Sequence, residues 1–137
     1  MRPLFQAHGQ ADVELADAIL TVHMRGDWNV EMRTQTAQQM LRHTPQLNAA
    51  GPWTILNVLH DTLVYSEAIY TDTRRDYAAR PPHSQLRAVA FVLSPKAEGA
   101  RIMASRFRTL LDGVITAEVF DDIAQARSWL TGQLQQA

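Results

Sequence analysis

Residues 53–59, WTILNVL, begin the stretch that decides the fold, because two similar runs follow it: residues 86–93, LRAVAFVL, and residues 114–120, VITAEVF. Each run is short and apolar, and each is followed by a turn signal and an amphipathic helix pattern. Runs of this kind are typical of strands that are buried on both faces of a parallel sheet. The pattern predicts an α/β fold with three mutually parallel, largely buried strands.

The N-terminal third predicts an antiparallel hairpin. Residues 12–16 and 19–24 are two short runs separated by Asp17-Ala18. In the second run apolar side chains alternate with polar ones, which is the period of a strand with one buried face. We expect residues 19–24 to join the same sheet as the three later runs. Residues 48–52 are expected to form the loop into the first buried strand.

Four helices are predicted, each from its capping residues and its apolar stripe. Their expected starts are Asp27 or Asn29, Ser66, Ser94 with Pro95 at the first helical position, and Asp121 or Asp122. Their expected ends are about His43, a residue before Pro81-Pro82, a left-handed Gly113, and the chain's C-terminal stretch. The residues expected to face inward are Val30, Ala37, Met40 and Leu41; Ile69, Tyr70, Thr73 and Tyr77; Ile102, Met103, Phe107, Leu110 and Leu111; and Ile123, Ala126, Trp129, Leu130 and Leu134. From the central strand we expect Ala88, Ala90 and Val92 in the core.

Composition narrows the class of protein. The 137 residues are expected to form one domain with its core at about residues 10–135, and the hydrophobic fraction of 46% is ordinary for a globular chain. A formal net charge of −1 argues against a nucleic-acid binder. The absence of cysteine excludes disulfides, thiolate zinc sites and cysteine nucleophiles. No signal-peptide pattern and no apolar stretch of about 20 residues is present, so a bacterial-type cytoplasmic protein without a membrane span is expected.

A hairpin, a helix and three strand–helix units together resemble the STAS-like fold of anti-sigma factor antagonists, closest to the SpoIIAA-like group that borders the CRAL-TRIO lipid-carrier fold. The resemblance is carried by residues 19–26, residues 54–66, and Val119-Phe120-Asp121-Asp122 leading to Ala126 and Trp129-Leu130. It implies a mixed, mainly parallel sheet with packed helices. It also implies a regulatory protein that is not an enzyme.

STAS antagonists typically carry Asp-Ser-Ser-Gly before their second helix, and a partner kinase phosphorylates the first Ser. In this chain the same stretch is Tyr65-Ser66-Glu67-Ala68, so the resemblance places Ser66 at the phospho-acceptor position. The Asp and the Gly of the motif are replaced by Tyr65 and Ala68. From the residues alone, Ser66 is either a helix N-cap or a phosphorylation switch, because a helix N-terminus favours a phosphate.

A ligand or partner surface is predicted where the parallel strands end, because open α/β sheets bind ligands at the carboxyl edge of their strands. The residues expected there are Asp27, Trp28, Asp61, Tyr65, Ser66, Ser94 and Lys96. A cleft with Trp28, Tyr65 and Lys96 would suit a small anionic or apolar ligand. The alternative is structural: Trp28 packs at a helix entry, Lys96 is solvated and the aspartates cap helices.

The remaining polar residues form no motif of known chemistry. The five histidines, at 8, 23, 43, 60 and 83, include no pair at i, i+4 spacing, so the usual helical metal pair is excluded and no metal or other cofactor is predicted. His60-Asp61 with Ser66 or Ser94 leaves a hydrolase as a third option, although Gly-x-Ser-x-Gly is absent. Arg101, Arg106, Arg108 and Lys96 make the third helix basic on its outer side, which is either solvated or faces an acidic partner.

The leading functional hypothesis is a non-enzymatic regulatory or protein-interaction module that acts through the turn and helix around Ser66. Its protein partner is unidentified. The alternative is a carrier or sensor of a small apolar, lipid-like ligand, which the resemblance to lipid carriers implies. The oligomeric state is open, and a homodimer is one option.

Overall fold

The computed structural model describes residues 9–26, 30–60, 67–94 and 99–136, and it contains a five-stranded sheet in the order β1-β2-β3-β4-β5. The strands are β1 (Gly9–Ala16), β2 (Ile19–Gly26), β3 (Trp53–His60), β4 (Leu86–Leu93) and β5 (Thr116–Phe120). β1 and β2 are antiparallel, and every later neighbour pair is parallel. The mixed, mainly parallel sheet confirms the predicted fold class, and β2 joins the three parallel strands as expected.

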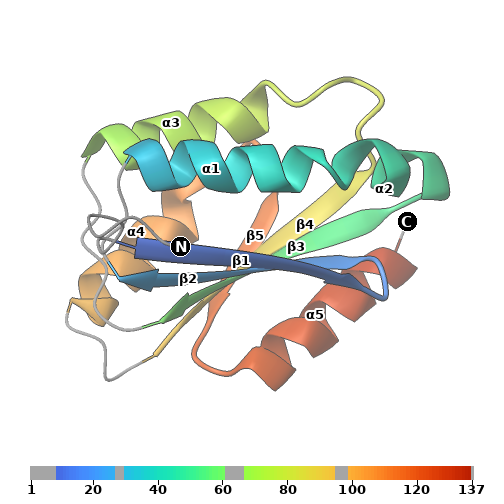
Figure 1. Cartoon of the computed structure of the whole chain (residues 1–137). Coiled ribbons are helices and arrows are strands. Elements are labelled where there is room, and N and C mark those ends of the chain that lie inside the picture. The colour runs from blue at the N-terminus through green and yellow to red at the C-terminus, as the bar shows by residue number, and fades with distance from the viewer. Residues whose placement is uncertain (1–8, 27–29, 61–66, 95–98, 137) are drawn as a thin grey trace.

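Helices cover the two faces of the sheet unequally (Figure 1). The helices are α1 (Val30–Leu41), α2 (Thr44–Ala50), α3 (Glu67–Ala78), α4 (Ala100–Leu110) and α5 (Ile123–Gln135). A large core cluster joins one face of the sheet to Leu47 of α2, Ile69 and Tyr70 of α3, and Met103 and Phe107 of α4. On the other face a smaller cluster forms under α5, which packs on β3, β4 and β5.

The hairpin turns through two residues with left-handed backbone. Asp17 and Ala18 have φ of 55° and 62°, and β1 pairs with β2 from Ala16 opposite Ile19 onward. A two-residue turn with both φ values positive matches the twist of the strands that it joins. The predicted hairpin is confirmed, together with its turn residues.

Burial follows position in the sheet. Every residue from Trp53 to Leu59 of β3 is buried, and β4 is buried except for Arg87. The prediction that residues 114–120 are buried on both faces is wrong, since β5 begins at Thr116, lies at the sheet edge and contains no buried residue. An edge strand has a neighbour on one side only, so its side chains stay partly in solvent.

Three of the expected inward residues instead face solvent. Leu41, Ile102 and Ile123 are exposed by 65%, 71% and 38%. Ile102 lies about 100° around α4 from Met103, whereas Met103, Phe107 and Leu111 follow one another at i, i+4 spacing and are all buried. The inward face of α4 is therefore narrower than its run of apolar residues suggests.

Three helix boundaries also differ from the prediction. Residues 48–50, expected in a loop, end α2, whose Leu47 is buried and whose Asn48 Oδ1 accepts hydrogen bonds from Trp53 Nε1 at 2.7 Å and Gln85 N at 2.8 Å. Asn48 thereby ties the starts of β3 and β4 together. Ser94-Pro95 does not begin α4, which starts at Ala100 after a left-handed Gly99. The first helix ends at Leu41 rather than His43.

Candidate functional site

The carboxyl ends of the parallel strands meet at one edge of the sheet, as the sequence predicts. β2, β3 and β4 end at Gly26, His60 and Leu93, and Ser94 follows β4 in a half-buried position. The other predicted site residues, namely Asp27, Trp28, Asp61, Tyr65, Ser66 and Lys96, lie outside the described residues. Their grouping into one surface remains a prediction.

The first turn of α3 is fixed by an ion pair with α4. Glu67, the first residue of α3, accepts two hydrogen bonds from Arg106, at 2.7 Å and 2.8 Å. The Arg106 guanidinium also lies over the ring of Tyr70, 4.2 Å from its centroid. Bidentate pairing and stacking are both geometries that a guanidinium provides and an ammonium does not. Arg106 is therefore more than a solvated charge on the basic side of α4.

The pKa values of all three side chains are shifted. The hydrogen bonds from Arg106 lower the pKa of Glu67, and the same bonds raise the pKa of Arg106. Burial raises the pKa of Tyr70, although the charge of Arg106 acts in the opposite direction. Both charges of the ion pair are kept at neutral pH, and α3 presents a fixed first turn at the edge where the predicted surface lies.

An exposed hydrophobic side chain stands one helical turn before Arg106. Ile102 is exposed by 71%, and Arg101 and Ser105 beside it on α4 are also exposed. Single exposed hydrophobic residues are common on protein surfaces. Here, however, Ile102 lies on the same side of α4 as Arg106, because residues i and i+4 share one helix face. Arg106 on that side pairs with Glu67 of α3.

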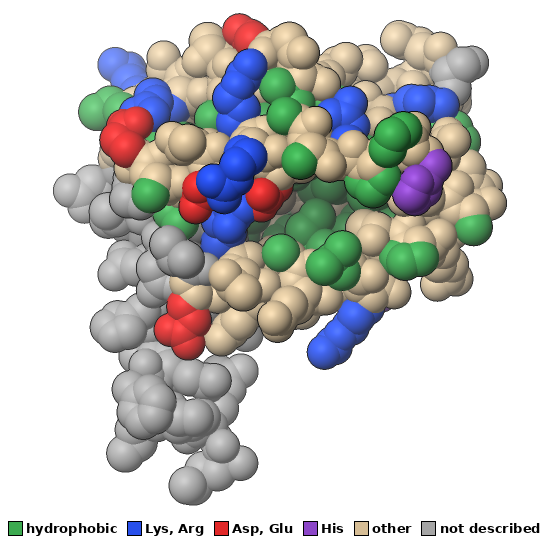
Figure 2. Space-filling view, turned by 90° about the horizontal axis from the view of Figure 1, so that it is seen from above, with side chains coloured by type: hydrophobic (Ala, Val, Ile, Leu, Met, Phe, Trp, Pro, Cys, Tyr) green, Lys and Arg blue, Asp and Glu red, His purple; other side chains and the backbone are tan. Residues whose placement is uncertain are grey.

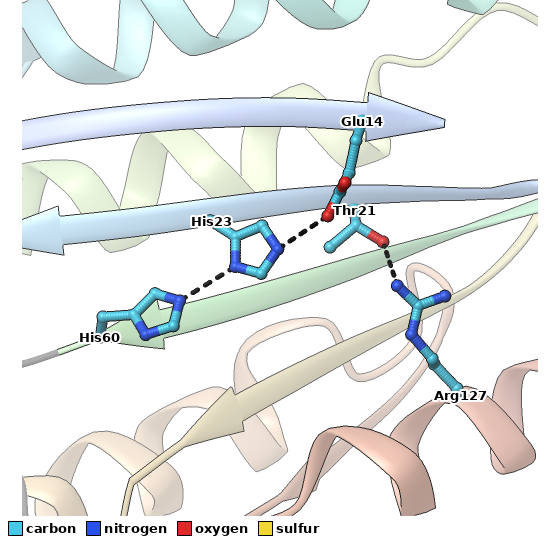
Figure 3. Close-up of polar contacts among 5 residues, drawn as sticks. All are labelled: Glu14, Thr21, His23, His60 and Arg127. Carbon is cyan, nitrogen blue, oxygen red and sulfur yellow. Dashed lines mark hydrogen bonds and ion pairs between the residues drawn. The ribbon is translucent and has the colours of Figure 1, made fainter. Parts of the chain in front are cut away.

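A second polar cluster lies on the α5-facing side of the sheet (Figure 3). His23 Nδ1 of β2 is 2.9 Å from His60 Nε2 of β3, and His23 Nε2 is 3.0 Å from Glu14 Oε1 of β1. The two imidazoles are stacked, with centroids 5.2 Å apart. Close by, Arg127 of α5 donates a hydrogen bond to the buried Thr21 hydroxyl at 3.3 Å.

The sequence analysis did not identify the histidine pair, because the register of β2 and β3 brings the two residues together and their spacing along the chain does not reveal it. His23 pairs with Val58 across β2 and β3, so His60 lies one pleat further on the same face. A search for i, i+4 spacing detects only pairs within one helix. In a Ser-His-Asp triad the Nε2 atom of the histidine contacts the serine hydroxyl. In this structure the Nε2 atom of His60 contacts His23.

The described residues contain neither a clustered metal site nor a membrane span. No group of three or more His, Asp or Glu side chains in ranges 9–26, 30–60, 67–94 and 99–136 is arranged to hold a metal ion. Over the same ranges, no helix combines the length and apolarity needed to cross a bilayer.

The arrangement of strands and helices is similar to that of a solved structure. That structure is the crystal structure of an anti-sigma factor antagonist from Mycobacterium paratuberculosis, with a TM-score of 0.52 and 13% sequence identity over 90% of this chain and 94% of that chain. No protein-family model and no curated protein matches the sequence. The likeness confirms the STAS-like fold, and at this identity it concerns the fold alone.

Proposed function

We propose that this chain is a non-enzymatic regulatory module that binds a protein partner of the anti-sigma factor type. The observation that carries the proposal is the fold shared with an anti-sigma factor antagonist over 90% of the chain. The proposed contact surface is the turn before α3, with the first turn of α3 and the adjoining side of α4. Glu67, Arg106 and the exposed Ile102 are its described members.

The surface has the physical features of a docking site. A bidentate ion pair links the first turn of α3 to α4, which restricts the Glu67 and Arg106 side chains before any partner binds. Ile102 supplies an exposed apolar group for the partner to contact. The neighbouring charges of Glu67 and Arg106 would orient the partner on the surface.

Ser66 is the proposed switch of this surface. A phosphate there would place about two negative charges directly before Glu67 in the chain, at the beginning of a helix. The helix N-terminus favours such a charge, whereas a partner surface fitted to the unmodified turn would be repelled.

The test compares two variants at residue 66 in complex formation. A partner captured with the tagged chain is purified and titrated against wild type, Ser66→Asp and Ser66→Ala. We expect Ser66→Asp to weaken the complex at least tenfold, while Ser66→Ala costs on the order of 1 kcal/mol of folding stability and leaves binding nearly unchanged. Ser128→Asp, an exposed position on α5 at the opposite face, is the matched control. Equal affinities for wild type and Ser66→Asp would remove Ser66 from the function.

A second candidate function is the binding of a small apolar ligand. Figure 2 shows a hollow between the ridges formed by α1 and α3, with hydrophobic side chains at its base. Arg33 of α1 bridges to α3 by pairing with Asp76 and donating a hydrogen bond to the Asp72 carbonyl. Met40 of α1 and Tyr77 of α3 are the half-buried hydrophobic residues that pack on the core from these helices.

Native mass spectrometry of the purified chain separates the two functions. A co-purified lipid-like molecule that is lost in Met40→Asp would favour the carrier. If only the free chain is detected, the protein-binding proposal stands without a competitor.

A further inference from the structure

We propose that His23 and His60 form a binding site for one transition-metal ion of the Zn²⁺, Ni²⁺ or Cu²⁺ class, independent of the partner surface at α3. The pair joins two strands, and its nitrogens come within 2.9 Å of each other without any helical spacing between the residues. Neither the fold nor the proposed regulatory function requires this contact.

The separation of the two nitrogens suits chelation. Two imidazole nitrogens that each lie about 2.0–2.1 Å from one metal ion, at an angle of about 90–110°, are about 2.9–3.4 Å apart. The observed distance between His23 Nδ1 and His60 Nε2 lies at the short end of this range. Because β2 and β3 are paired in fixed register at this point, the sheet holds the two nitrogens close together, and rotation of the rings about their side-chain bonds would direct both at one ion.

Glu14 selects the nitrogen of His23 that can bind a metal. The Glu14 carboxylate accepts the hydrogen on His23 Nε2, which leaves the lone pair of the neutral ring on Nδ1. A carboxylate on the outer nitrogen is the usual support of a metal-bound histidine. Metal binding at His23 Nδ1 and His60 Nε2 requires neutral rings whose hydrogens lie on the outer nitrogens, so the hydrogen shared between the two facing nitrogens must leave that position when the ion binds.

The surroundings determine which ions fit. Asp12 stands opposite His23 in the sheet and Arg25 stands opposite His60, so among the described residues the charged groups that flank the pair in the sheet are Asp12, Glu14 and Arg25. The side chains of His23 and Glu14 are 22% and 64% exposed, so water can complete the coordination. Two nitrogen ligands favour borderline transition metals over Mg²⁺ and Ca²⁺, which take oxygen ligands.

The test is a calorimetric titration of the chelator-treated, tag-free chain with ZnCl2 and NiCl2 at pH 7.5. We expect one equivalent to bind, at least tenfold more tightly than to the variant His23→Gln/His60→Gln. Glu14→Gln should weaken binding by about tenfold, because it removes the support of the His23 ring. His83→Gln, which changes an exposed histidine outside the pair, should bind as wild type does, and MgCl2 should give no heat of binding.

The spectroscopic readout is the ¹⁵N shift of His23 Nδ1 and His60 Nε2, which should both move on addition of Zn²⁺. The proposal is wrong if wild type binds no more tightly than the double variant, or if His83→Gln loses as much affinity as the double variant does. Thermal unfolding of each variant confirms that the sheet is intact before titration.

Discussion

The ring of Phe107 on α4 lies on the ring of Phe91 on β4, with centroids 4.4 Å apart and ring planes 21° from parallel. Tyr70 of α3 tilts against the same Phe107 ring at 5.6 Å. Phe107 is 1% exposed, so a single side chain joins the central sheet to both helices that form the proposed surface. The position of Arg106, its neighbour on α4, depends on this packing.

Phe107→Ala should lower the free energy of unfolding by about 3–5 kcal/mol, because it removes a fully enclosed aromatic ring and leaves a cavity. Urea denaturation followed by circular dichroism measures the change. The control is Ile102→Ala on the same helix, which should cost less than about 1 kcal/mol since Ile102 is 71% exposed. A loss under about 1 kcal/mol for Phe107→Ala would contradict its place in the core.

Replacing the hairpin turn Asp17-Ala18 by Asn-Gly should stabilise the protein. Both residues have positive φ, a conformation that costs an alanine roughly 1 kcal/mol and a glycine nearly nothing. We expect Asp17→Asn with Ala18→Gly to raise the free energy of unfolding by about 0.5–1 kcal/mol, read from the urea midpoint. Ala18→Val, which worsens the strain, should lower the midpoint, and a rise in that variant would contradict the turn geometry.

The sequence predicts the strands better than the helix faces. β3 and β4 are found within one residue of their predicted ends, because buried parallel strands are continuous apolar runs between polar turns. Ile102 and Leu41 were predicted to face inward because helical spacing alone suggested it. Whether such a residue is buried depends on which element packs against that side of the helix, and spacing does not reveal this. α2 was missed because its buried side consists of Leu47 alone.

Contacts between distant residues were beyond sequence reasoning. The pairing of His23 with His60 depends on the register of β2 and β3, and the pairing of Glu67 with Arg106 depends on how α3 lies beside α4. Neither is encoded in local spacing. By contrast, the segments that carry the predicted surface could be placed at one sheet edge, because the carboxyl ends of parallel strands must meet there.

Asp122, and not Asp121, should be the residue whose loss weakens α5. Asp122 is the N-cap, and its carboxylate accepts a hydrogen bond from Gln125 N at 3.2 Å. Asp122→Ala should therefore cost about 1 kcal/mol in urea denaturation. Asp121→Ala, one residue outside the helix, is the matched control and should change stability by less than about 0.5 kcal/mol. Equal effects in the two variants would contradict the assignment of the cap to Asp122.

Stability should decline at alkaline pH through Tyr77. Burial raises the pKa of Tyr77 to about 12, although the Asn57 side chain acts in the opposite direction. The ordinary tyrosine pKa is about 10, so the unfolded chain loses this proton first, and the stabilisation is complete below about pH 10 and lost as pH rises toward 12. The full loss is at most about 2–3 kcal/mol. Urea midpoints between pH 8 and 11 should fall less steeply in Tyr77→Phe than in wild type, and parallel curves would contradict the shift.

Ile102→Asp should weaken partner binding at least tenfold without destabilising the fold. The side chain is 71% exposed on α4, so a carboxylate there stays hydrated in the free protein, but it must lose that hydration in an interface. Leu41→Asp is a matched control, because Leu41 is 65% exposed and is the last residue of α1, whereas α3 begins near the other end of α1 (Figure 1). Titration of the captured partner against both variants gives the comparison. If Leu41→Asp weakens the complex and Ile102→Asp does not, the partner binds elsewhere and the proposed surface at α3 and α4 is wrong.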